Sequence, residues 1–297
     1  MVEVAVYKPF CATVVFGLIA CGLAGEAAGQ VPRPNQGVLN PKAREITGQL
    51  GASFNNPGLQ NSIDVAWTKP LSTSTSPLLA GARVAAGVVS VTTPTMTRAG
   101  GWVEYAPLSI VAVRAGIEPI VYFGSFSSLM PFPSYDSTFD QDVLSQKIGT
   151  SAGVGLKGYV TPSIQVRARR VVARVSADLE YWRSSADGPF FYEATRDQLL
   201  ASGGDRLINT TGVAMYEHPT GSGGAVSAGV FHGLTRVFDA GQNQSQRLGI
   251  IGITQFASTH LRVPKPRITV LLYRYLDDRF KQDSWGGAIA IGFRTGR

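Results

Sequence analysis

From Arg44 to the C-terminus, apolar residues alternate with small or polar residues in short stretches separated by turn-rich connectors. The stretch 285–293 shows the pattern most plainly. Its odd positions include Trp285, Ile289 and Ile291, whereas its even positions hold only glycine and alanine. A period of two is typical of β-strands, and two unlike faces indicate a sheet whose sides meet different surroundings.

The same alternation predicts about twelve strands, with ten or fourteen as alternatives. The expected ranges are 44–54, 60–68, 78–91, 100–106, 109–122, 149–167, 170–183, 206–217, 224–236, 246–257, 267–276 and 284–295. If the N-terminus is periplasmic, the two longest connections, 123–148 and 184–205, fall at the outer end. Long outer loops and short periplasmic turns are typical of membrane barrels. The sequence therefore predicts an all-β fold, an antiparallel transmembrane up-and-down β-barrel over 44–297.

One turn is predicted by a change of parity. Apolar residues occupy even positions between Ala152 and Val166, and odd positions from Val171 onward. A strand cannot exchange its faces without a turn or a bulge, so we expect a turn near Arg169. Pro162 lacks the N–H that a closed sheet needs, and a turn at 161–163 is therefore the alternative.

The first 43 residues predict export. An apolar stretch at 10–24 is followed by small residues at 27–29, which favours a signal peptide over 1–29. The four residues ending at Cys21 are similar to a bacterial lipobox, so lipidation of Cys21 is an alternative. Three prolines then predict an extended periplasmic lead-in at 30–43.

Composition narrows the function classes. Both cysteines lie in the predicted signal peptide, which excludes disulfides and cysteine–metal sites from the mature body. The formal net charge is +7, but the arginines lie in alternating strands instead of a basic helix or tail. This disfavours nucleic-acid binding and favours attraction to anionic lipid head groups or a small anionic solute.

The final strand carries a motif. A polar residue, a glycine, two apolar residues and an aromatic residue follow the spacing of the β-signal that the outer-membrane assembly machinery reads, at Ser284, Gly286, Ile289, Ile291 and Phe293. The four residues after Phe293 depart from this pattern, in which an aromatic residue usually closes the chain. With its strand pattern, 44–297 resembles bacterial outer-membrane β-barrel proteins of porin-like architecture. The resemblance implies a Gram-negative outer membrane, with its lipids, lipopolysaccharide and assembly machinery as partners.

Charged residues lie opposite the apolar face in the clearest strands. They are Asp64, Arg83, Arg114, Glu118, Lys157, Arg167, Arg174, Asp178 and Glu180. Charge facing lipid is unfavourable, so we predict that these side chains line the lumen. There they either pair into a plug or line a polar passage. In an open lumen, Arg114 and Arg174 would raise the local anion concentration.

Aromatic residues gather near the predicted strand ends, which favours interfacial girdles facing lipid. The residues are Trp67, Trp102, Tyr105, Tyr122, Phe123, Tyr181, Trp182, Tyr216, Tyr273, Tyr275, Trp285 and Phe293.

Catalytic signals are weak. Ser258 and His260 superficially offer a nucleophile and a base, as outer-membrane lipid hydrolases use. His218 and His232 fit surface positions, and the aspartates of 136–142 and 277–283 lack the glycine and glutamate of a calcium loop. We expect no enzyme, metal or cofactor.

These observations favour a porin-like passive channel or a non-enzymatic structural barrel with a charged lumen. The alternatives are an outer-membrane lipid hydrolase and a periplasmic, lipid-anchored β-protein that acts as an interaction module.

Overall fold

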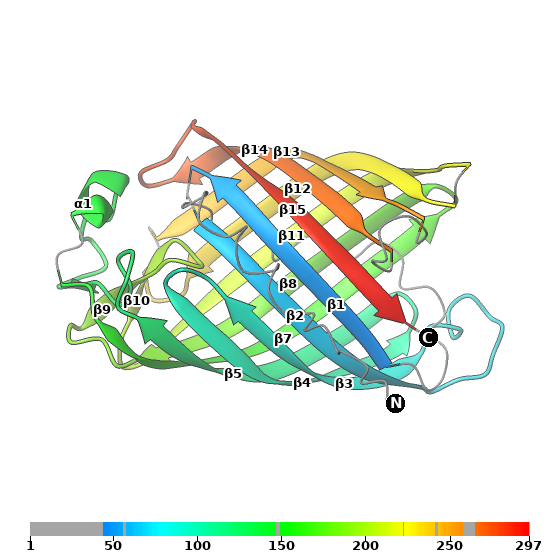
Figure 1. The fold of residues 1–297 in the computed structure, drawn as a ribbon, viewed down its shortest axis with the longest axis horizontal. Coiled ribbons are helices and arrows are strands. Elements are labelled where there is room, and N and C mark those ends of the chain that lie inside the picture. Colours follow the sequence, from blue (N-terminus) through cyan, green and yellow to red (C-terminus); the bar gives the residue numbers. More distant parts are fainter. Residues whose placement is uncertain are drawn as a thin grey trace, which may run out of the picture.

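The computed structural model describes residues 44–55, 58–146, 149–221, 223–240, 243–257 and 265–296. Twelve strands close into one antiparallel barrel, in which the last strand pairs with the first (Figure 1). The barrel strands are β1 (Arg44–Phe54), β2 (Gly58–Pro70), β3 (Arg83–Thr92), β4 (Met96–Leu108), β5 (Val111–Phe123), β7 (Ala152–Ala168), β8 (Val171–Ser184), β11 (Asp205–Pro219), β12 (Ala225–Val237), β13 (Gln244–Gln255), β14 (Arg267–Asp278) and β15 (Trp285–Gly296). The predicted fold class and the count of twelve are confirmed.

The alternating sequence produces two unlike barrel faces. Ile289 and Ile291 are 49% and 58% exposed on the outer face, whereas Ala288 and Ala290 between them are buried on the inner face. Apolar side chains on the outside of a closed sheet suit lipid, and closure leaves no unpaired edge within the bilayer. Within the described residues, no helix is long and apolar enough to cross a membrane.

The two barrel ends differ in their connections. Glu45 near the start of β1 pairs in register with Gly296 at the end of β15, so both strands reach the same end, here called the terminal end. The opposite end, here called the loop end, carries the two longest connections, between β5 and β7 and between β8 and β11. Because long loops face the exterior in bacterial outer-membrane barrels, the predicted orientation assigns the terminal end to the periplasmic side.

The long connections fold together at the loop end, at the left of Figure 1. Strands β6 (Pro131–Phe132), β9 (Phe190–Glu193) and β10 (Gln198–Ala201) form a three-stranded sheet in the order β10-β9-β6. One short helix, α1 (Gln141–Ser145), begins after Asp140, whose side chain accepts a hydrogen bond from Val143 N at 3.0 Å. Such capping satisfies a backbone donor at the start of the helix.

The expected turn near Arg169 is present, and its alternative at 161–163 is wrong, because strand β7 runs unbroken through Pro162, which is exposed and pairs with Val113. The expected start of the third strand was also wrong, because the strand begins at Arg83 and not at residue 78. Leu79 N and Ala80 N both donate to the Ser76 carbonyl, because this apolar run has no alternation to hold it extended.

Candidate functional site

The inner wall carries a charged cluster on strands β2 to β5. Arg83 Nη2 lies 2.7 Å from Glu104 Oε1, and Arg114 lies 3.2 Å from Asp64 and 3.6 Å from Glu104. The Arg114 guanidinium also stacks 3.6 Å from the ring centroid of Trp102, whose indole N–H donates to Asp64 at 3.2 Å. Each charge therefore has an opposite charge beside it along the wall.

A second cluster surrounds Glu180 on β8. Its carboxylate, 3% exposed, lies 2.9 Å from Lys157 Nζ and accepts a hydrogen bond of 2.8 Å from the indole N–H of Trp182. Arg196, from the connection between β8 and β11, contacts the same carboxylate through Nε at 2.8 Å and Nη2 at 2.5 Å. A residue of an outer loop is thus anchored to a residue of the barrel wall.

The segment 185–204 is docked at the loop-end mouth. Its Phe191 and Leu200 are fully buried and pack with Trp182 and Leu207 of the barrel strands. A second apolar cluster above this one contains Tyr192 and Leu199 of the segment together with Phe132, Phe139 and Leu144 of the connection between β5 and β7. Burial of so many large side chains gives this mouth its own hydrophobic core.

Polar contacts reinforce the docked segment. Tyr122 Oη on β5 donates to Glu193 at 2.7 Å, Tyr192 Oη donates to Asp197 at 2.7 Å, and Lys281 pairs with the same aspartate. Burial and the charge of Asp197 raise the pKa of the Tyr192 phenol well above its usual value, so the phenol remains a donor.

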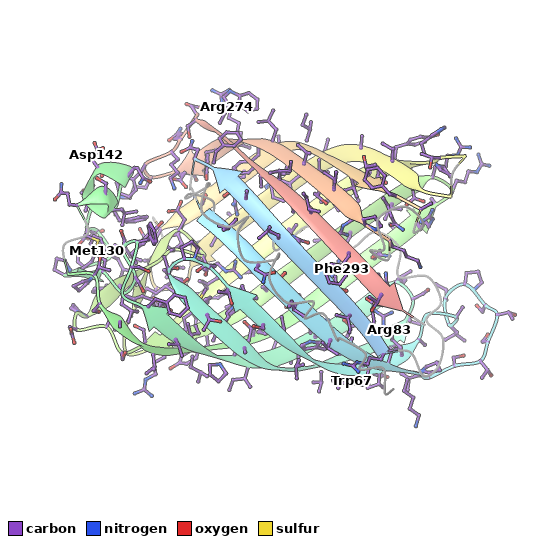
Figure 2. The ribbon with its side chains drawn as sticks, viewed as in Figure 1. Trp67, Arg83, Met130, Asp142, Arg274 and Phe293 are labelled. Carbon is purple, nitrogen blue, oxygen red and sulfur yellow. The ribbon has the colours of Figure 1, made fainter. Side chains whose placement is uncertain are left out.

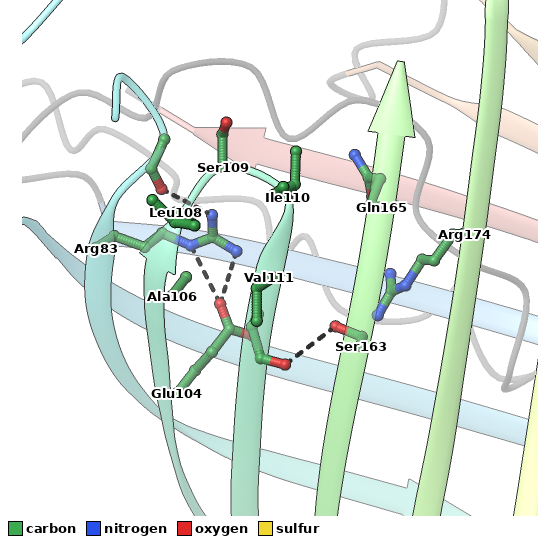
Figure 3. Close-up of a pocket in the computed structure, with 12 residues that line it drawn as sticks. Arg83, Glu104, Ala106, Leu108, Ser109, Ile110, Val111, Ser163, Gln165 and Arg174 are labelled. Carbon is green, nitrogen blue, oxygen red and sulfur yellow. Dashed lines mark hydrogen bonds and ion pairs between the residues drawn. The ribbon is translucent and has the colours of Figure 1, made fainter. Parts of the chain in front are cut away.

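A small cavity opens in the inner wall near the terminal end (Figure 3). It has a volume of about 50 Å³, and its polar lining includes Arg83, Glu104, Ser163, Gln165 and Arg174. Such a volume accommodates only a few water molecules. The cavity is therefore a hydrated recess of the lumen wall and not a pocket for an organic solute.

The structure brings the sequence-predicted charges to the inner wall in separate groups. Glu118 pairs with Arg98 at 2.7 Å, and Asp178 accepts hydrogen bonds from Thr161 at 2.7 Å and Asn209 at 3.2 Å. Arg167 lies at the terminal rim, with its side chain 41% exposed, and pairs with Glu217 at 2.5 Å. The partners of Arg114 are Asp64 and Glu104.

The residues of the predicted assembly signal lie in or beside β15. Ser284 precedes the strand and accepts a hydrogen bond from the Asn55 side chain at 2.8 Å. A Cβ added at Gly286 would lie 2.5 Å from the Tyr273 ring, so this position requires glycine. Phe293 covers Gly48 across the seam between β15 and β1, where an added Cβ would lie 2.2 Å from its ring. Cys21, the predicted signal peptide and the predicted lead-in lie outside the described residues.

Sequence reasoning missed three members of the wall clusters. Glu104 and Arg98 lie on β4, where Trp102 inside and Val103 outside make both faces apolar and obscure the polar side. Arg196 lies in a connection, where no periodicity marks its direction. Only Glu104 had a usable signal, because its apolar neighbours Val103 and Tyr105 indicate that its side chain lies on the opposite, inward face.

The girdle prediction was wrong for five aromatic residues. Trp102, Tyr122, Trp182, Tyr273 and Tyr275 are buried in the barrel interior. Their parity explains this placement, because each lies on the inward-facing positions of its strand. The large outward aromatic residues include Trp67, Tyr105, Tyr181, Tyr216 and Trp285.

The histidines do not form a catalytic arrangement among the described residues. His232 contacts Gln246 at 3.0 Å, and His218 is exposed near the end of β11. Ser258 and His260 lie outside the described residues. The described part of the chain also has no group of three or more potential metal ligands.

No family model and no curated protein matches the chain. Solved structures with a similar fold include a NanC porin, with 11% identity and a TM-score of 0.43 over 85% of this chain and 99% of that one. Another is the β domain of the Bordetella autotransporter Brka, with 12% identity and a TM-score of 0.48 over 85% and 99%. A loop-deletion mutant of OmpT, an outer membrane protein of Vibrio cholerae, has 8% identity and a TM-score of 0.35 over 86% and 98%.

At these identities the likeness concerns the fold alone. The closed twelve-stranded barrel, with its apolar exterior and charged interior, is itself the architecture of outer-membrane proteins. The chain has the fold of an outer-membrane β-barrel protein.

Proposed function

We propose that the protein is a porin-like passive channel for small polar solutes, with a preference for anions, and that the docked segment 185–204 narrows its outer mouth. The observation that carries this proposal is the direction of the interior ion pairs. Arg83–Glu104, Arg98–Glu118 and Lys157–Glu180 each join adjacent barrel strands.

Pairing between adjacent strands favours a passage over a plug. A side chain that pairs with the next strand lies along the wall, whereas a plug of side chains needs contacts that cross the lumen. Arg114–Asp64 reaches farther, from β5 to β2, but it too follows one side of the wall. A wall lined with ion pairs offers donors and acceptors to passing solutes while its charges remain balanced.

The anion preference rests on Arg247, which lies on β13 and away from the charged cluster of β2 to β5. Its guanidinium lies 5.6 Å from the Tyr273 ring centroid, and its buried Nε lacks a hydrogen-bond partner. Positive side chains in a low-dielectric wall raise the local anion concentration. Arg114 contributes less, because Asp64 and Glu104 neutralise it.

Single-channel recording on the refolded full chain tests this proposal. We expect discrete conductance steps, and a reversal potential in a salt gradient that indicates anion preference. Arg247→Gln should shift this potential toward cations, whereas Arg114→Gln should leave the potential nearly unchanged and lower thermal stability. A sealed bilayer at every voltage, both for the native chain and for a variant with the docked segment released, would refute the channel.

A sealed result in both cases favours a second function, a structural barrel that presents its loop end to a partner. The observation behind it is the separate hydrophobic core of the loop-end sheet. We further propose that the barrel is not a lipid hydrolase. Turnover of phospholipid and lipid A by the purified protein should therefore be undetectable, and the same in His232→Ala and His260→Ala. Turnover that either substitution abolishes would instead show that the barrel is a lipid hydrolase.

A further inference from the structure

The outward charges at the terminal end are all positive among the described residues. Arg44 on β1, Lys69 on β2 and Arg170 in the turn between β7 and β8 are exposed, as are Arg169 and Lys265. The carboxylates at this end turn inward instead. Glu45 and Glu217 are each 6% exposed and pair with Arg294 and Arg167.

The loop end has a mixed rim. Arg206 pairs with Asp239 at 3.6 Å, and Arg274 pairs with Asp283 at 2.9 Å, all on exposed side chains. Arg183 and Arg236 are exposed here as well, so among the described residues the loop end mixes outward cations with exposed carboxylates, whereas the terminal end has outward cations alone. Figure 2 shows Arg274 and Trp67 at opposite ends of the barrel.

The terminal cations also adjoin outward aromatic rings. The Arg44 guanidinium lies 6.0 Å from the ring centroid of Trp67, which is 50% exposed, and Lys69 follows two residues later on the same face of β2. Arg170 Nη1 lies 3.1 Å from the hydroxyl of exposed Tyr216. Amphipathic rings of this kind sit at head-group depth, which brings the neighbouring cations to the level of the lipid phosphates.

We propose that this terminal rim, formed by Arg44, Trp67, Lys69, Arg170 and Tyr216, binds the phosphate groups of anionic phospholipids in the periplasmic leaflet. The proposal does not depend on whether the lumen conducts. Head-group phosphates complement a rim of unopposed cations, and each basic residue near an anionic surface strengthens binding about fivefold.

Two outward tryptophans report on the two rims separately. Trp67 lies beside Arg44 and Lys69, and Trp285 pairs in register with Arg274, whose charge Asp283 neutralises. Trp102 and Trp182 are buried in the interior and contribute a constant background. Trp285→Phe therefore isolates Trp67 as the lipid-facing reporter, and Trp67→Phe isolates Trp285.

Quenching by brominated phosphatidylglycerol, compared with brominated phosphatidylcholine at the same mole fraction in vesicles, measures local lipid enrichment. We expect at least fivefold enrichment of phosphatidylglycerol at Trp67, reduced by high salt, and none at Trp285. Equal enrichment at both tryptophans, or at neither, would overturn the proposal, because net charge alone would then explain it.

Charge-removing variants assign the effect to the rim. Arg44→Gln with Lys69→Gln should abolish enrichment at Trp67, and Lys69→Gln alone should reduce it severalfold. The control pair Arg206→Gln with Arg274→Gln removes the same number of positive charges from the loop end and should leave enrichment at Trp67 unchanged. Undiminished enrichment at Trp67 in Lys69→Gln, confirmed as folded by its heat-modifiable gel migration, contradicts the assignment.

Discussion

Glu180 holds the docked segment to the barrel, so Glu180→Gln should release it. The carboxylate is buried and shared by Lys157 at 2.9 Å and Arg196 at 2.5 Å. Its neutralisation removes the one carboxylate that these two buried cations share. Breaking a buried ion pair by removing one partner destabilises by ~3–5 kcal/mol.

Most of this loss should fall on segment 185–204. Lys157 belongs to a barrel strand held by backbone pairing on both sides, whereas Arg196 belongs to a connection outside the barrel sheet. A loss of about 3 kcal/mol raises the undocked population on the order of a hundredfold. Arg196→Gln should have a smaller effect, because Glu180 keeps Lys157 as its partner.

Hydrogen exchange of the detergent-refolded protein measures this opening. We expect the amides of 185–204 to exchange on the order of a hundredfold faster in Glu180→Gln while the barrel strands stay protected. Asp187→Asn, which removes an exposed carboxylate from the same segment, is the matched control and should exchange as the native chain does. Unchanged protection in Glu180→Gln, or equal loss in Asp187→Asn, would show that the ion pairs do not hold the segment.

Three further outcomes are expected. Ile289→Arg should prevent assembly, because a midplane cation facing lipid costs about 2–4 kcal/mol, whereas the inward Ala288→Ser should fold, as heat-modifiable gels will show. Gly48→Val should weaken closure of the barrel by displacing the ring that covers it and lower the melting temperature, unlike Gly252→Ala, which meets open space. Because the pKa of Tyr192 is raised in the docked state, its neutral phenol favours docking at pH values below the ordinary phenol pKa. This contribution is lost as the pH rises through the raised pKa. Exchange of the segment should therefore depend less on alkaline pH in Tyr192→Phe.

The alternation of apolar residues with small or polar residues predicted most of the fold. A strand between lipid and a polar lumen must present unlike faces, so the pattern predicted the number of strands. The change of parity around Arg169 likewise predicted a tight turn that the structure contains. Strand ends were less accurate where apolar residues run together, as at 78–82. These residues belong to a connection outside the sheet, where no second face imposes alternation.

The mouth could not be predicted, because its contacts are not periodic. Arg196 reaches Glu180 only through the folding of two long connections against each other. The inward placement of the aromatic residues, in contrast, could have been predicted from the sequence. Trp182 occupies an even position in β8, whose lipid-facing positions are odd, so parity alone would have directed it inward. The rule that aromatic residues belong in girdles was given too much weight against that signal.

The seam between β1 and β15 has a consequence for the order of folding. Arg294 pairs with Glu45 across 249 residues of sequence, and Phe293 covers Gly48 at the same seam. The most distant contacts in the chain are therefore also the ones that remove its last two open edges. Closing so large a loop is slow, and an unclosed sheet exposes edges that invite aggregation. A nascent chain lacking only its final strand would consequently be the most hazardous intermediate, and productive assembly requires those edges to be shielded until the last residues arrive.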